Sequence, residues 1–149
     1  MRTALTIFTL IGTAFFFIGF ILLPWSPFNQ AKGYEFLIPQ APAIMQWWNV
    51  VLWILVAAII ATTIAQLLNW QRPVISLSLI FLAIGATSLF GFYTVFANTN
   101  AAIAAFDTER SIQPGQGFLL SALGTLSLAL SGLAHIYMEQ PHELTPDDV

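Results

Sequence analysis

The chain has 149 residues, of which 58% are hydrophobic and only 7% are charged, and its formal net charge is −3. Soluble domains carry about 25% charged residues, so this composition is typical of a protein that lies in a lipid bilayer. With only four basic residues and a negative net charge, the chain is not expected to bind nucleic acid. Cysteine is absent, which excludes disulfides, thiolate metal sites and covalent c-type haem.

Four long apolar runs contain none of the charged residues and none of the eight prolines. About 20 residues of helix cross the hydrocarbon core of a bilayer, and each run is at least that long. The runs lack the alternation of barrel strands, so helices are the remaining way to satisfy the backbone in lipid. We therefore predict a single-domain (1–149) all-α membrane protein, an antiparallel four-helix transmembrane bundle, with spans at about 4–23, 47–68, 74–97 and 118–138. The first run is longer than a signal-peptide core and is followed by no Ala-x-Ala site, so we expect it to be retained.

Tryptophans stand at the ends of these runs, where interfacial anchors belong. Trp25 follows the first span, Trp47 and Trp48 open the second, and Trp70 follows its end. Trp48 and Trp70 are 22 residues apart, or about 33 Å of helix, which is close to the thickness of the hydrocarbon core. We predict that these four residues anchor the bundle at the membrane interfaces.

The connections between the runs predict the topology. The turn 69–73 is short enough only for an antiparallel helical hairpin. The longer loops 24–46 and 98–116 then share the other side of the membrane, and 101–106 is a candidate short interfacial helix. Both termini lie on the side of the short turn.

The orientation of the bundle depends on where the basic residues lie. Arg2 and Arg72 adjoin spans directly on the side of the termini, whereas Lys32 and Arg110 lie in the long loops. Because basic residues next to span ends favour the cytoplasmic side, we predict a multi-pass membrane protein with both termini in the cytoplasm.

One face of the fourth run gathers small and polar residues, which are Gly117, Ser121, Gly124, Thr125 and Gly132. Small residues at helical spacing let backbones approach closely in lipid. The first interpretation is packing within the bundle, and the second is docking against a helix of another subunit. The first run carries a lesser stripe of Thr6, Thr9 and Thr13, with Gly12 and Gly19 alongside, which also indicates packing and interhelical hydrogen bonds.

His135 is the one titratable group expected to touch the membrane interior. A histidine with a small residue four positions earlier, here Ser131, resembles the arrangement that ligates bacteriochlorophyll magnesium in single-span antenna helices. A neutral imidazole can also bind haem iron. Against both stands its place near the headgroups, with no second histidine in a span for bis-His haem. The alternative is an interfacial histidine hydrogen-bonded to a neighbouring helix or lipid, while His142 is expected to be solvated in the tail.

The aromatic content offers a second possible cofactor site. Thirteen phenylalanines include Phe15, Phe16, Phe17 and Phe20 in the first run and Phe90, Phe92 and Phe96 in the third. These rings could line a quinone, carotenoid or chlorin site. Phenylalanine is also an ordinary core and lipid-facing residue, so burial without a cofactor is the first interpretation.

The sequence offers little for catalysis or transport. Hydroxyls, two separate histidines and scattered loop carboxylates form no evident acid–base or metal constellation, so we expect no enzymatic activity. Carboxylates at membrane depth and prolines that break a span, which are typical of coupled transporters, are absent from the four runs. A small channel or transporter is a remaining alternative.

In layout the chain resembles small four-span bacterial membrane proteins of uncharacterised function, in which a Pro-Trp pair follows the first span and a Pro-Gly-x-Gly stretch opens the last. Here these motifs are Pro24-Trp25 and Pro114–Gly117. The layout also looks like that of claudins, but their loop cysteines and Gly-Leu-Trp motif are missing. We predict a non-catalytic accessory or scaffold subunit of a multi-subunit bacterial membrane complex, such as a respiratory or photosynthetic one, with the bilayer and other integral membrane subunits as partners. The alternative is a pigment-, haem- or quinone-binding subunit that uses His135.

Overall fold

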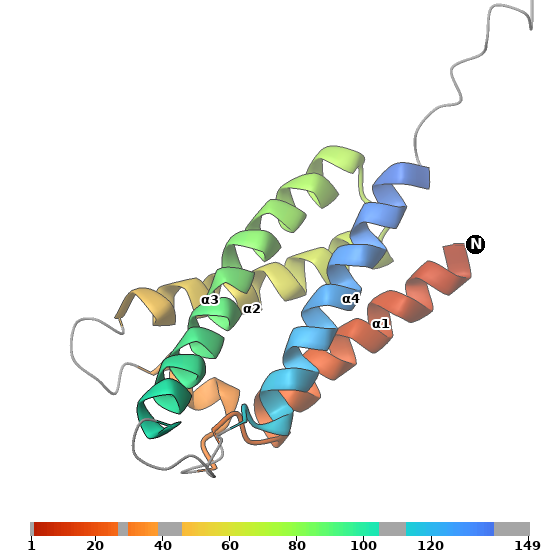
Figure 1. Ribbon diagram of the computed structural model, residues 1–149. Helices are drawn as coiled ribbons and strands as arrows, with labels where there is room; N and C mark the ends of the chain where they lie inside the picture. The colour runs from red at the N-terminus through yellow and green to blue at the C-terminus, as the bar shows by residue number, and fades with distance from the viewer. Residues whose placement is uncertain (1, 27–29, 39–45, 105–112, 139–149) are drawn as a thin grey trace, which may run out of the picture.

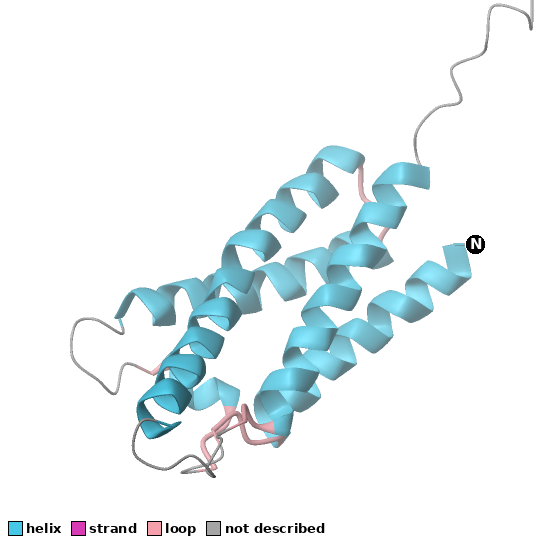
Figure 2. Ribbon diagram, in the orientation of Figure 1, coloured by secondary structure: helices cyan, strands magenta, loops and turns pink. Residues whose placement is uncertain are grey.

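A computed structural model of the chain describes residues 2–26, 30–38, 46–104 and 113–138. Four long helices run up and down in chain order, and the described residues contain helices and loops but no strand (Figures 1 and 2). The elements are α1 (Arg2–Phe17), the π-helical turn η1 (Ile18–Leu22), the 3-10 helix η2 (Gly33–Leu37), α2 (Gln46–Leu67), α3 (Arg72–Ala104) and α4 (Gln116–Met138).

The bundle has two chemically different ends. The start of α1, the α2–α3 turn and the end of α4 lie together at one end, which we call the terminus end (Figure 1). The opposite end, where η1 meets η2 and α4 begins, is called the loop end.

All four helices are long and apolar enough to cross a membrane. The predicted four-helix transmembrane bundle is therefore confirmed.

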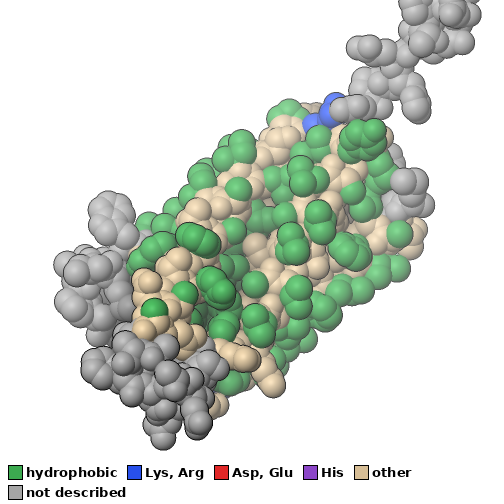
Figure 3. All heavy atoms as spheres, viewed as in Figure 1, with side chains coloured by type: hydrophobic (Ala, Val, Ile, Leu, Met, Phe, Trp, Pro, Cys, Tyr) green, Lys and Arg blue, Asp and Glu red, His purple; other side chains and the backbone are tan. Residues whose placement is uncertain are grey.

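The outer surface of the bundle carries many large hydrophobic side chains. Large hydrophobic side chains that are more than half exposed occur on each long helix, among them Ile7, Trp53, Leu77, Phe90 and Leu130. Figure 3 shows hydrophobic side chains over most of the visible face. In water such a surface would drive aggregation, whereas in lipid it faces acyl chains of the same polarity. The fold thus belongs to a multi-pass membrane protein.

The helices pack most closely as two pairs, α1 with α4 and α2 with α3. In the first pair backbones meet: a Cβ placed on Gly124 would overlap the backbone at Phe16 and the carbonyl of Gly12. In the second pair a glycine receives a larger partner, since Gly85 lies against Leu55. In lipid the hydrophobic effect does not drive helices together. Close van der Waals contact at these small residues therefore stabilises both helix pairs.

The end of the third helix differs from the sequence prediction, whereas the first span ends close to the predicted residue. The third span was expected to end at Ala97, with a separate helix at 101–106, but α3 continues unbroken to Ala104. The segment 98–104 has no proline or glycine and is rich in alanine, so nothing in it interrupts the helix. The first span ends in a π-turn, in which the Leu23 N–H donates to the Ile18 carbonyl at 3.3 Å, just before Pro24 terminates it.

Candidate functional site

The small-residue face of α4 is covered within the chain. Gly117, Ser121, Gly124, Thr125 and Gly132 are all buried. A Cβ on Gly117 would overlap carbonyls of Gly19 and Leu23, and one on Gly132 would overlap the side chains of Leu79 and Gln66. The α4 face therefore packs against the other three helices. The burial of these residues favours our first interpretation, packing within the bundle. Thr125 also lines an open groove between α3 and α4, so docking against a helix of another subunit stays a prediction.

A polar cluster lies near the terminus end of the bundle, where α1, α2 and α4 meet. It consists of Thr9, Gln66 and Ser131, whose exposed fractions are 1%, 5% and 1%. Gln66 Oε1 accepts hydrogen bonds from Thr9 Oγ1 at 2.6 Å and from Ser131 Oγ at 2.7 Å, and the two hydroxyl oxygens are themselves 2.7 Å apart. Gln66 Nε2 donates to the Leu128 carbonyl at 3.3 Å. One glutamine thus joins three helices.

Further hydroxyls continue the polar contacts from this cluster toward the middle of the bundle. One turn along α1, Thr13 Oγ1 lies 2.8 Å from Thr63 Oγ1 of α2, and either hydroxyl can be the donor. Each hydroxyl oxygen also lies within hydrogen-bond distance of the carbonyl four residues earlier, at 2.8 Å from that of Thr9 and 2.7 Å from that of Ile59. With one proton each, the two hydroxyls can donate only two of these three hydrogen bonds at a time. Such bonds between spans contribute roughly 0.5–2 kcal/mol each in membrane proteins.

His135 lies on the same buried face, one turn beyond Ser131, and is 8% exposed. The macrocycle interpretation needs open space over the small residue at position 131. That space is filled, because Ser131 is covered by Thr9 and Gln66. The residues around His135 therefore do not fit a chlorin or haem placed over Ser131. His142 lies outside the described residues.

The loop end is built around Trp25, which is 1% exposed. Its indole N–H lies 3.1 Å from the Gly19 carbonyl and 3.3 Å from Ser121 Oγ. Ring contacts with centroid separations of 5.3–6.2 Å surround it, from Phe20, Phe36, Phe92 and Phe118. The prediction that Trp25 is an interfacial anchor is therefore wrong: its side chain contacts protein on all sides. The chain on both sides of this ring is held to the bundle by backbone hydrogen bonds, since the Trp25 N–H donates to the Ala31 carbonyl at 2.7 Å and the Gly115 N–H donates to the Trp25 carbonyl at 2.9 Å.

The phenylalanines considered for a cofactor site divide into two groups. Phe16, Phe17, Phe20, Phe92 and Phe96 belong to the packed interior or pack against it, whereas Phe15 and Phe90 are exposed at 39% and 68%. Because the interior rings contact one another directly, burial explains their presence in the sequence.

The two motifs that carry the family resemblance contact each other. The Gly115 N–H donates to the Trp25 carbonyl at 2.9 Å, and the Gly117 N–H donates to the Pro24 carbonyl at 3.0 Å. A Cβ on Gly115 would overlap the Pro24 carbonyl, so the close approach requires glycine there. Pro24-Trp25 and Pro114–Gly117 are one structural unit that joins the end of the first span to the start of the last.

The other predicted anchors occupy more open positions. Trp48 is 39% exposed and covers Gly91 of α3, and Trp70 is 45% exposed beside the α2–α3 turn. Both are thus placed where an indole can reach the bilayer. The side chain of Trp47 lies outside the described residues.

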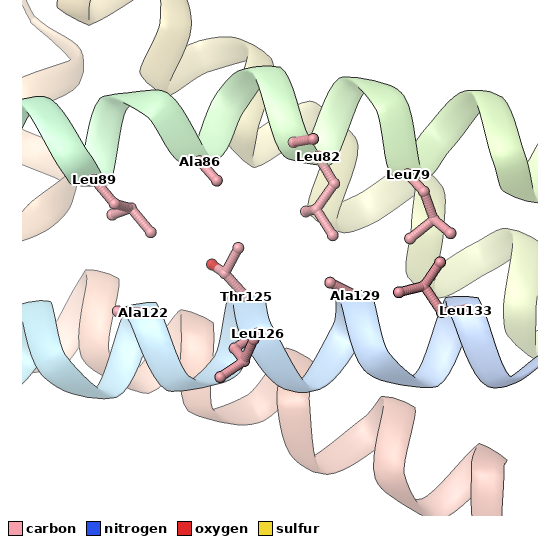
Figure 4. A pocket seen from close by; sticks show the side chains of 10 residues that line it. Leu79, Leu82, Ala86, Leu89, Ala122, Thr125, Leu126, Ala129 and Leu133 are labelled. Carbon is pink, nitrogen blue, oxygen red and sulfur yellow. The ribbon is translucent and has the colours of Figure 1, made fainter.

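A groove separates α3 from α4 on the outside of the bundle. It has a volume of about 380 Å³ and is lined almost entirely by leucine and alanine, with Thr125 as its one hydroxyl. Figure 4 shows side chains of both helices pointing toward each other across this space. Thr125 Oγ1 donates to the Ser121 carbonyl of its own helix at 2.9 Å, so the groove presents no unpaired polar group at that residue. The lining residues are Leu79, Leu82, Ala83, Ala86, Leu89, Ala122, Thr125, Leu126, Ala129 and Leu133.

Comparisons with known proteins return no family model, no curated protein and no solved structure that matches this chain. The function must therefore be argued from the residues themselves.

Proposed function

We propose that the protein is a non-catalytic accessory or scaffold subunit of a multi-subunit bacterial inner-membrane complex, and that a transmembrane helix of another subunit packs into the groove between α3 and α4. The observation that carries this proposal is the groove. A second pocket, beside Trp48 and Phe36 at the loop end, is smaller, at about 70 Å³ against about 380 Å³ for the groove.

The length and lining of the groove suit a helix. The lining extends from Leu79 to Leu89 on α3 and from Ala122 to Leu133 on α4, which is roughly 15 Å, or about three helical turns, along each. Four of its ten lining residues are alanines, which allow a neighbouring backbone to come close while the leucines fill its flanks. The groove chemistry therefore favours a partner with small residues on one face.

Filling the groove tests the proposal. The tagged protein is purified from membranes of its native host in a mild detergent, and subunits that accompany it at fixed stoichiometry are identified. We expect Ala86→Trp and Ala129→Trp to release these subunits because the indole occupies the groove. Ala57→Trp is the matched control, since Ala57 is exposed on α2, outside the groove. Release by all three variants, or unchanged co-purification with the two groove variants, contradicts the proposed interface.

The proposed orientation places both termini and the α2–α3 turn in the cytoplasm. The chain has no cysteine, so single cysteines can be introduced without a background signal. Asn69 at the turn and Gln113 at the loop end are both exposed. We expect a membrane-impermeant maleimide to label Gln113→Cys from the periplasm and to leave Asn69→Cys unlabelled until the membrane is opened. The opposite pattern reverses the orientation.

A further inference from the structure

One basic side chain is in line with the groove between α3 and α4. Arg72 is the first residue of α3, and the lining residues Leu79 and Ala86 follow it at intervals of seven residues. Seven residues are close to two full helical turns, so these three positions share nearly the same face of α3. The lining of α3 begins at Leu79, about 10 Å along the helix axis from Arg72. Arg72 therefore lies at the terminus end of the groove.

The charge of Arg72 is not neutralised by the described part of the chain. Its side chain is half-buried, and among the described residues the guanidinium has no hydrogen-bond or ion-pair partner. The one carboxylate in these residues, Glu35, belongs to η2 at the loop end, where it accepts a hydrogen bond from the Lys32 N–H at 3.2 Å. Figure 3 shows basic atoms on the surface at the terminus end. The first turn of α3 adds partial positive charge from the helix dipole, so this end of the groove attracts an anion.

Arg72 and the groove lie at the depths of a phospholipid headgroup and its acyl chain. Trp70 is 45% exposed two residues before Arg72, at the level expected for the membrane interface. The groove begins about 10 Å deeper and continues for roughly 15 Å, which is half the thickness of the hydrocarbon core. Its lining is apolar and open to the lipid, and an empty groove would lose dispersion contacts along its whole length. An acyl chain that fills this space brings its own phosphate close to Arg72.

The surroundings of Arg72 also favour one class of headgroup. A guanidinium binds phosphate oxygens through paired N–H groups. Zwitterionic phospholipids carry an amine beyond the phosphate, and in the described part of the terminus end no carboxylate can receive that amine. A phospholipid with a net negative charge, such as phosphatidylglycerol, has no such amine. Its headgroup therefore keeps the full attraction of the arginine.

We propose that the free subunit binds one anionic phospholipid, with the phosphate on Arg72 and one acyl chain in the groove between α3 and α4. This binding needs no partner subunit and so goes beyond the proposed function. One consequence does rest on the proposed function: a partner helix that packs into the groove displaces the acyl chain. Exchange of lipid for helix is then a step of assembly.

Competition between two lipids tests the site on the purified full chain in detergent. Phosphatidylglycerol and phosphatidylethanolamine with identical acyl chains are added in equal amounts, and native mass spectrometry counts the lipids bound to each chain. We expect one retained lipid per chain and an about fivefold preference for phosphatidylglycerol, the attraction that one basic residue supplies at an anionic surface. Equal binding of the two lipids would overturn the proposal, and it is the result expected if a carboxylate of the tail pairs with Arg72 instead.

Variants of the basic residues locate the headgroup. Arg72→Gln should abolish the preference but keep the bound lipid, because the acyl chain still fits the groove. Arg72→Lys keeps the charge and should keep most of the preference. Arg2→Gln is the matched control, since Arg2 is also a basic residue of the terminus end but begins α1, outside the groove. A preference that persists in Arg72→Gln, or one that Arg2→Gln abolishes equally, would overturn the site.

Variants of the groove locate the acyl chain. Ala86→Trp should lower the binding of both lipids because the indole occupies the groove, whereas Ala57→Trp, exposed on α2, should not. Unchanged lipid binding by Ala86→Trp would place the lipid elsewhere and overturn the proposal. These measurements contain no second subunit, so their failure leaves the proposed partner helix untouched. Arg72→Gln separates the two proposals further, since it should lose the lipid preference and still retain the co-purifying subunits.

Discussion

The two ends of the bundle are held together by opposite chemistries. At the terminus end, three polar side chains from three helices meet through contacts of 2.6–2.7 Å between oxygens. At the loop end, Trp25 lies among aromatic rings and forms its polar contacts with Gly19 and Ser121. Because burial in lipid gains little from the hydrophobic effect, directional bonds select the helix neighbours at one end and shape selects them at the other. At the loop end the chain that follows the first span also packs against the start of α4, because Gly115 and Gly117 donate to the carbonyls of Trp25 and Pro24.

Removing the Trp25 ring at the loop end should give the largest change in the free energy of unfolding. Trp25→Ala leaves a cavity against Phe20, Phe92 and Phe118, and we expect it to lower the free energy of unfolding by about 3–5 kcal/mol. Reversible unfolding in mixed micelles measures the change. Trp70→Ala is the control, since its ring is 45% exposed and its loss should change the free energy by less than about 1 kcal/mol. Equal effects of the two variants would mean that Trp25 acts only as a surface anchor.

At the terminus end the expected effect is smaller. Gln66→Leu keeps the volume but removes the acceptor of the Thr9 and Ser131 hydroxyls. We expect a loss of about 1–2 kcal/mol in the same assay, because the hydroxyls can still bond to the Leu5 carbonyl and to each other. The exposed Gln71→Leu in the α2–α3 turn should be neutral. A loss equal to or larger than that of Trp25→Ala would contradict the expectation that the aromatic end contributes more to stability than the polar end.

The smallest expected effect is an increase in the free energy of unfolding. Among the described residues, Thr62 Oγ1 is the one buried side-chain oxygen or nitrogen without a hydrogen-bond partner. Thr62→Val replaces it with a methyl group and should stabilise the protein by up to about 1 kcal/mol. Its neighbour supplies the comparison, because Thr63 is paired with Thr13 and Thr63→Val should destabilise instead. In thermal unfolding we expect Thr62→Val to raise the melting temperature and Thr63→Val to lower it. A change of the same sign in both variants would contradict this expectation.

The spans could be predicted because run length and the absence of charge depend on the bilayer alone. The end of α3 could not, since the polar residues after Ala97 look like a loop although nothing in them stops a helix. A tryptophan beside prolines at a span end looks like an anchor, so the burial of Trp25 was missed. The apolar stretch Phe36-Leu37-Ile38 was a usable signal, because a loop with such a stretch packs on the bundle.

The spacing of the glycines predicted which face of α4 is buried. It did not predict which residues of the other helices contact that face. Thr9 and Ser131 lie on faces that the sequence marks as packing surfaces, whereas Gln66 is a single polar residue near the end of an apolar run. Its role depends on the register between α1, α2 and α4, which a single sequence does not encode in any local pattern. The contact between Pro24-Trp25 and Pro114–Gly117 was hidden for the same reason, since about ninety residues separate the two motifs.

The central claim is that the polar and small-residue face of α4 packs against α1 of its own chain. Cross-linking tests it most directly, because Thr9 Oγ1 and Ser131 Oγ are 2.7 Å apart and the chain has no other cysteine. The double variant Thr9→Cys/Ser131→Cys should form a disulfide within one chain in native membranes on mild oxidation. That product should migrate faster than the reduced monomer. Absence of a cross-link, or a product made only of two chains, would contradict the account.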